Sequence, residues 1–171
     1  NNVYAKYNVL HADQYNVSAK TAQLVYMFEK EIPNDTIVQR YRFVDSDDWC
    51  EGSYIERLRR ALVDTASDVA ECDYLCTESL EAGADSAQKE GGCEVFEGRE
   101  CFHRFLTNVF FVSVCNKLYR RALLENLPFR LGVYHEDEFW TYQIFSRARR
   151  VCRLHDIGYY YYQRQGSIVH T

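Results

Sequence analysis

The stretch Arg42-Phe43-Val44-Asp45-Ser46-Asp47-Asp48-Trp49 places three carboxylates within four residues, at the end of an apolar run. Like charges held this close repel one another, and a divalent cation with a polyanionic ligand relieves the repulsion. A solvated acidic turn that caps the next helix is the alternative interpretation. Apolar residues flank the turn on both sides and are expected to be buried, which favours a ligand site over a solvated turn.

The segments on either side of this turn are predicted to be a strand and a helix. Residues 36–44 are rich in β-branched and aromatic side chains, and Ser53 with Glu56 has the spacing of a capping box. Apolar residues then recur on one face as far as Ala66. The carboxylates would therefore follow a strand and precede a helix, which is where open α/β sheets bind ligands.

The other segments extend this pattern into an α/β fold of one domain over residues 1–171. Residues 21–31 are apolar almost all round, and their length favours a buried helix. Residues 79–92 are rich in Glu, Ala, Gly and Ser and are predicted to be mobile. The remaining predictions are strands at 72–76, 93–96, 110–114, 151–154 and 159–162 and helices at 99–106, 120–125 and 136–148.

Composition limits the classes of function. The chain has 171 residues, 47% of them hydrophobic, which is enough for a real core and excludes a disordered polymer. Its net charge of −5 argues against a nucleic-acid partner, although four arginines gather at residues 147–153.

Cysteine usage and hydropathy suggest a compartment. The seven cysteines form no Cys-x-x-Cys pair, and we interpret them as small buried hydrophobes in a reducing environment. The sequence contains no apolar stretch of membrane-spanning length and no signal peptide. We therefore expect a cytoplasmic protein. Peripheral association with the inner face of the membrane and a homodimer both stay open.

A second acidic cluster, Glu136-Asp137-Glu138, follows His135 where a loop is predicted to enter a helix. Helix capping alone would account for it, because acidic residues are common in first turns. The functional interpretation is a general base, since a carboxylate beside a metal-bound electrophile can take a proton from an attacking hydroxyl. The sequence alone leaves the two about equally favoured.

Two further groups carry chemistry. Asn116 and Lys117 place an amide and a cation together, where the lysine could pair with phosphate or with an acidic cluster, or lie on the surface. The tyrosines at 159–162, followed by Arg164, could stack on sugars or form the aromatic edge of the core.

Taken together, these motifs resemble the inverting family 2 glycosyltransferases of the GT-A type, which elongate bacterial capsular and cell-wall sugars. Residues 43–49 are similar to the DxD signature of that family, and residues 116–124 to its NKLY block. Residues 136–139 resemble its ED motif, and residues 160–168 its terminal motif. The resemblance implies a GT-A-like (Rossmann-like) mixed sheet flanked by helices.

On the donor side, the resemblance implies a nucleotide-diphosphate sugar bound with Mn²⁺ or Mg²⁺. Asp45 would contact the ribose and the metal, and Asp47 would ligate the metal between the two phosphates. Asp48 would belong to the same donor site, and Arg164 would close over the donor.

On the acceptor side, the resemblance implies a glycan or lipid-linked acceptor. Asp137 would act as the base on its hydroxyl, with Glu136 beside it. Asn116 and Lys117 would line the acceptor or diphosphate side. Inversion would follow from a single in-line displacement.

The amino-terminal part departs from the family. The first strand, the Pro-x-Tyr-Asn loop and the second strand that hold the nucleotide base have no counterpart here, so the resemblance describes a GT-A domain truncated at its amino end. Three explanations stay open: a fragment, a sequence that omits residues, or a degenerate relative that serves as a non-catalytic sugar-binding or scaffold domain. A metal-dependent phosphohydrolase would also place acidic residues at the end of a strand, but it gives no reason for the later motifs to be present.

Overall fold

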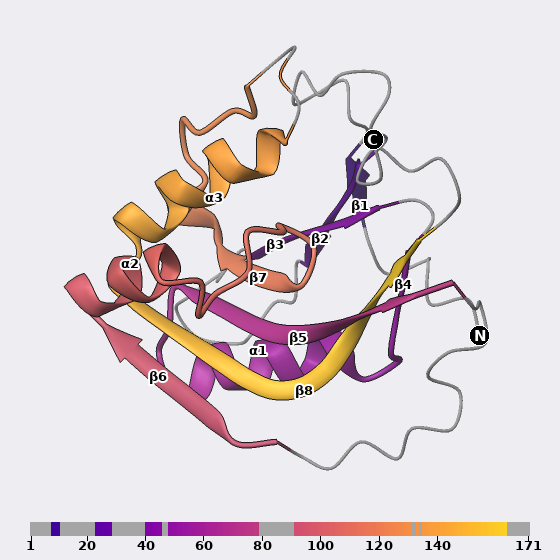
Figure 1. Cartoon of the computed structure of the whole chain (residues 1–171), viewed down its shortest axis with the longest axis horizontal. Helices are drawn as coiled ribbons and strands as arrows, with labels where there is room; N and C mark the ends of the chain where they lie inside the picture. Colours follow the sequence, from indigo (N-terminus) through magenta and orange to yellow (C-terminus); the bar gives the residue numbers. More distant parts are fainter. Residues whose placement is uncertain are drawn as a thin grey trace.

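The computed structural model describes residues 8–10, 23–28, 40–45, 48–78, 91–130, 133 and 135–163, with the first three ranges described as backbone. These residues form a mixed sheet flanked by helices (Figure 1). The predicted α/β class is therefore confirmed. Of the segment 79–92, only residues 91 and 92 lie within the described ranges.

The described strands join into one sheet in the order β1-β2-β3-β7-β5-β8-β4, and β6 also pairs with β8. The central pair, β5 with β8, is parallel, and the other described pairs are antiparallel. The strands are β1 (Asn8–Leu10), β2 (Gln23–Phe28), β3 (Arg40–Asp45), β4 (Trp49–Cys50), β5 (Val69–Thr77), β6 (Cys93–Glu97), β7 (Lys117–Arg120) and β8 (Arg150–Tyr162).

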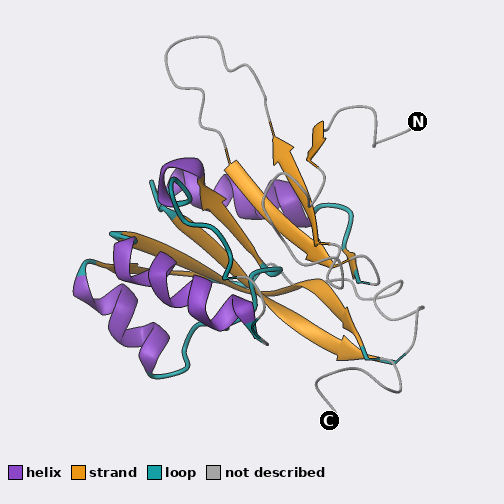
Figure 2. Ribbon diagram, turned by 90° about the horizontal axis from the view of Figure 1, so that it is seen from above, coloured by secondary structure: helices purple, strands orange, loops and turns teal. Residues whose placement is uncertain are grey.

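Helices cover both faces of this sheet. Figure 2 shows α1 (Tyr54–Asp64) on one side and α2 (Arg99–Leu106) with α3 (Glu136–Arg147) on the other. A short 3₁₀ turn, η3 (Arg121–Leu123), follows β7. Within the described ranges, no helix combines the length and apolar character needed to cross a membrane.

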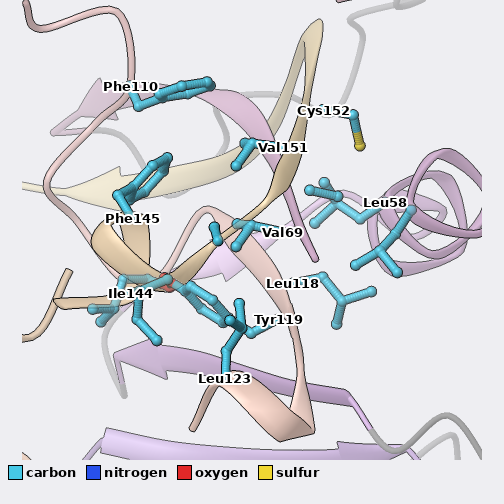
Figure 3. Packing of buried hydrophobic residues seen from close by; sticks show 14 of the residues in the cluster. Leu58, Val69, Phe110, Leu118, Tyr119, Leu123, Ile144, Phe145, Val151 and Cys152 are labelled. Atoms are coloured by element: carbon cyan, nitrogen blue, oxygen red, sulfur yellow. The ribbon is translucent and has the colours of Figure 1, made fainter. Parts of the chain in front are cut away.

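The core lies on both sides of the central strand pair (Figure 3). Val69 of β5 is opposite Val151 of β8, and neither is exposed to solvent. On the α3 side, Phe145 stacks on Phe105 with ring centroids 4.8 Å apart. On the other side, the buried Leu58 of α1 lies near Cys152 (Figure 3). Alternate residues of β5 and β8 thus serve two apolar layers.

The helix predicted to follow the acidic turn is confirmed as α1, but its capping differs from the prediction. Both the backbone N–H and the hydroxyl of Ser53 donate to Glu51 Oε2, at 3.1 and 2.6 Å. Glu56 instead pairs with Arg59 at 2.7 Å. The prediction of a capping box is therefore wrong, because Ser53 donates its hydrogen bonds to Glu51, which precedes the helix.

Other element predictions also differ from the structure. Residues 23–28 form β2 rather than part of a helix, and they pair with β1 and β3 on both edges. Apolar periodicity does not separate a short buried strand from a buried helix. Residues 120–125 contain η3 and turns, and β8 runs unbroken from residue 150 to 162. Its register shifts opposite Asp73, which accommodates the polar residues that suggested two strands.

The cysteines match their interpretation in part. All seven are free thiols, and the majority, Cys72, Cys101, Cys115 and Cys152, are buried. Cys76 and Cys93 are exposed, so these two do not serve as buried hydrophobes.

Gly158 allows β8 to lie close against α1. A Cβ at this position would lie 2.2 Å from Cδ2 of the Tyr54 ring and 3.2 Å from Cys72 Sγ. We expect Gly158→Ala to lower the free energy of unfolding by about 1–3 kcal/mol, because overpacking a filled core displaces its neighbours. Urea unfolding would measure the change.

Gly52→Ala is the matched control, since a Cβ there would have no atom within 4 Å. Its effect should stay within about 0.5 kcal/mol. Equal losses in the two variants would contradict the close approach at Gly158.

Candidate active site

One carboxylate of each acidic motif lies close enough to the carboxyl-terminal half of β5 to act on one of its side chains. Burial and then the negative charge of Asp48 raise the pKa of the Cys76 thiol. Burial is also the main cause of the raised pKa of the Tyr74 phenol, and the charge of Asp137 adds to it. Both carboxylates therefore act electrostatically on side chains of this one strand. The fold brings together motifs that are about 90 residues apart in the sequence.

Asp137 lies in the first turn of α3 and is half-buried. Burial raises the pKa of its carboxyl, and the neighbouring charge of Glu136 raises it further. The backbone N–H of Glu138 donates to Asp137 Oδ1 at 3.0 Å, which opposes the rise. Capping would lower the pKa of a carboxylate, and here burial outweighs that effect. A raised pKa suits a group that accepts a proton.

Asp48 has a different environment. The hydroxyl of Tyr159 donates to its Oδ2, and the backbone N–H of Tyr162 donates to its Oδ1 at 2.9 Å. Both carboxylate oxygens are therefore held by the end of β8. The expectation that Asp48 belongs to the donor site stays a prediction, and these two contacts show that its carboxylate is also held from within the protein.

Lys117 and Asn116 are also enclosed. Neither has any exposed surface. The Lys117 ammonium pairs with Glu71 at 2.9 Å and donates to Asn116 Oδ1 at 2.9 Å, while Asn116 Nδ2 donates to the Cys72 carbonyl at 2.6 Å. In the described structure they tie β7 to β5 inside the protein, and the expectation that they line the acceptor or diphosphate side stays a prediction.

This buried pair belongs to a larger network that holds the segment from Phe111 to Asn116. Burial raises the pKa of Glu71 and lowers that of Lys117, and the attraction between the two opposes both shifts. The backbone N–H of Phe111 donates to Glu71 at 3.1 Å. Four successive carbonyls, of Val112, Ser113, Val114 and Cys115, accept from the side chains of Thr141, Lys117, Tyr119 and Tyr54.

The segment was predicted to contain a strand at 110–114, and it is instead a series of turns and bends. Most partners of its backbone groups are side chains from α1, β5, β7 and α3, and the Asn116 carbonyl accepts from the backbone N–H of Cys72 in β5 at 3.1 Å. Thr141 lies one turn after Asp137 on α3, and its hydroxyl donates to Val112 at 2.7 Å. The network therefore fixes the start of α3 against the sheet.

Other predicted site residues lie at the margin of the described structure. Asp45 is the last residue of β3, where its backbone pairs with Gln23, and its side chain is not described. Asp47 and Arg164 lie outside the described residues. Glu136 begins α3 and is half-buried. Among the described residues, no group of three His, Cys, Asp or Glu side chains is placed to hold a metal.

Sequence reasoning missed Glu71 and Tyr74 as members of the site's surroundings, and it noted Tyr159 only as part of the tyrosine run at 159–162. Glu71 carried one usable signal, an acidic residue between the apolar Ala70 and Cys72. The ring of Tyr74 meets the Phe111 ring edge-on at 4.7 Å, and Arg153 lies over the same Phe111 ring at 5.0 Å. No local pattern predicts these contacts, because they join distant segments.

Comparison with known proteins supports one class. No family profile matches the chain. Over 137 residues, or 74% of this chain, it is 28% identical to glycosyltransferase GlyA of Streptococcus pneumoniae serotype 4 and covers 19% of that protein. It is 29% identical over 136 residues, again 74% of the chain, to EpsH of Bacillus subtilis, also named as a glycosyltransferase, and covers 38% of it. The chain is similar to glycosyltransferases.

Solved structures share the fold. S. aureus TarS 1–349 in complex with UDP-GlcNAc matches with a TM-score of 0.54 and 23% identity, over 76% of this chain and 36% of that one. The complex of TarS 1–349 with UDP matches with a TM-score of 0.52 over 71% of this chain and 35% of that one. This chain therefore spans less than two fifths of each of these relatives.

The buried ion pair gives a test of the network. We expect Lys117→Met to lower the free energy of unfolding by about 3–5 kcal/mol, because Glu71 is left buried without its counter-ion. Adding Glu71→Gln should recover part of the loss, since the unpaired charge is removed. Chemical denaturation of the three proteins would measure both changes.

Arg104→Met is the matched control, because Arg104 forms an exposed ion pair with Glu100 at 3.0 Å on α2. Its loss should stay below about 1 kcal/mol. A Lys117→Met variant as stable as this control would show that the buried pair does not hold the segment.

Proposed function

We propose that the chain is part of a metal-dependent, inverting family 2 glycosyltransferase of the GT-A type. It would transfer a sugar from a nucleotide-diphosphate sugar to a glycan or lipid-linked acceptor. The observation that carries the proposal is that this chain, which is similar to proteins named as glycosyltransferases, holds one carboxylate of each acidic motif near β5. The binding of UDP-GlcNAc and UDP by TarS, which has the same fold, supports a nucleotide-sugar donor.

The donor set fits a hard divalent cation. Asp45 and Asp47 offer carboxylate oxygens, which suit Mg²⁺ and Mn²⁺. Such ions in phosphoryl sites use one or two carboxylates together with substrate phosphates rather than a cage made only of protein. When bound, the metal would neutralise the charge that develops on the departing diphosphate.

The environment of Asp137 supports its role, and the roles of Asp45 and Arg164 are those that the resemblance implies. Asp137 would accept the proton of the acceptor hydroxyl, and the raised pKa of its carboxyl makes it a stronger base than an exposed aspartate. Glu136 would reinforce this by its charge. Asp45 would also contact the ribose, and Arg164 would close over the donor.

The metal site is tested by calorimetry of Mn²⁺ with UDP on the intact natural protein. We expect saturable binding of UDP that depends on Mn²⁺ and is lost in Asp47→Ala, because the variant lacks a charged ligand of the metal. Ser46→Ala is a neighbouring control that keeps all three carboxylates and should retain binding. If the unaltered protein shows no metal-dependent binding, the non-catalytic scaffold is the better interpretation.

The base is tested by Asp137→Asn, which keeps the side chain's shape and its acceptor oxygen for the Glu138 N–H. We expect donor binding near normal and no measurable transfer, read as release of UDP from a panel of UDP-sugars in the presence of acceptor. Unchanged turnover would contradict the assignment.

The same variant should also be more stable than the wild type at pH 7. The pKa of Asp137 is raised in the folded state above its ordinary value of 3.8, so folding favours the protonated form. Stability from this group is therefore lost as pH rises from 3.8 through the folded pKa. Neutral asparagine avoids the loss, and we expect a gain of about 0.5–2 kcal/mol that narrows as pH falls. Glu138→Gln, on the exposed side, should show no gain.

A further inference from the structure

The carboxylate of Asp48 is held at both oxygens by the end of β8. Oδ2 accepts from the hydroxyl of Tyr159, and Oδ1 accepts from the backbone N–H of Tyr162 at 2.9 Å. An ionised carboxylate accepts at both oxygens, whereas an asparagine would present an N–H₂ group to one of the two donors. The position is therefore specific for aspartate.

The elements around this contact are rigid. Trp49 and Cys50 of β4 pair with Tyr160 and Tyr159 of β8, and the Trp49 ring stacks on the Tyr160 ring with centroids 5.5 Å apart and planes 5° apart. Tyr159 is only 1% exposed, and its ring packs against Tyr54 of α1 at 6.4 Å. The donor hydroxyl is thus fixed by the core and not by a flexible surface side chain.

Asp48 also occupies a particular place in the chain. It lies three residues after Asp45, the end of β3, and immediately before β4. The carboxylates proposed to bind the metal are Asp45 and Asp47, so the contact with β8 fastens the chain next to them. Metal sites lose affinity when the groups that orient their ligands are removed.

We propose that Asp48 and Tyr159 form a positioning pair that sets the metal-binding carboxylates, and that Asp48 does not itself contact the metal or the nucleotide. The inference rests on the proposed function. The pairing lets a motif of three close carboxylates present only part of its charge to the ligand, because the Asp48 charge is already satisfied by two donors.

This assignment and a direct ligand role for Asp48 differ in how Tyr159→Phe and Asp48→Asn combine. If Asp48 were a metal ligand, Asp48→Asn would still weaken Mn²⁺ binding strongly in the Tyr159→Phe background, and such a loss overturns the positioning pair. If Asp48 acts only through the pair, Asp48→Asn weakens Mn²⁺ binding little further once the tyrosine hydroxyl is gone.

The experiment is a titration of Mn²⁺ into the intact natural protein at saturating UDP, followed by calorimetry, with melting temperatures measured in parallel. We expect Tyr159→Phe to weaken Mn²⁺ binding about tenfold. Asp48→Asn should weaken it at least as much. The control is Tyr119→Phe, which also removes one buried tyrosine hydroxyl, donated here to the Val114 carbonyl at 3.2 Å. It should lower the melting temperature by a similar amount and leave Mn²⁺ affinity unchanged.

Each outcome separates the two proposals. Unchanged or stronger Mn²⁺ binding in Tyr159→Phe overturns the positioning pair alone, provided that Asp47→Ala still abolishes binding. Equal weakening in Tyr159→Phe and Tyr119→Phe also overturns it, because general destabilisation would then explain the loss. Absence of metal-dependent binding in the unaltered protein overturns the proposed function and this inference with it.

Discussion

The fully buried ion pair between Glu71 and Lys117 is the interaction on which the arrangement around β5 depends. Removing two charges from water is costly, and good geometry with further hydrogen bonds is needed to offset the cost. Here the carboxylate also accepts the Phe111 N–H, and the ammonium also donates to Ser113 and Asn116. The pair thereby replaces a missing strand neighbour, because it supplies partners for backbone that has no sheet or helix ladder of its own.

This support explains why the two acidic motifs can lie across one strand. The segment that the ion pair holds accepts a hydrogen bond from Thr141, one turn beyond Asp137 on α3. On the other side, the parallel pairing of β5 with β8 brings the tyrosines of β8 beside β5, and these tyrosines hold Asp48. The positions of both carboxylates therefore follow from contacts of the central strands, and neither depends on an isolated loop.

The sequence predicted the parts of the fold that local pattern determines. The helices predicted from the sequence match α1, α2 and α3 to within two residues at each end. It failed where tertiary contacts replace local ones: β2, which is paired on both edges, and the segment held by Glu71 and Lys117. For the site, charge clustering identified the acidic motifs. The resemblance placed Asn116, Lys117 and Asp48 at ligands, and sequence does not reveal that these side chains also have partners inside the protein.

The protein treats its two described key carboxylates in opposite ways. Asp48 meets two donors that favour its charged form, and it is thereby fixed in place. Asp137 is buried beside other acidic residues, which disfavours its charged form and raises its pKa. The proposed base, Asp137, has the second environment, and the proposed anchor, Asp48, has the first. The difference arises from where each aspartate lies, one against the end of β8 and one at the start of α3, so the proposed division of labour would follow from the fold rather than from residue type.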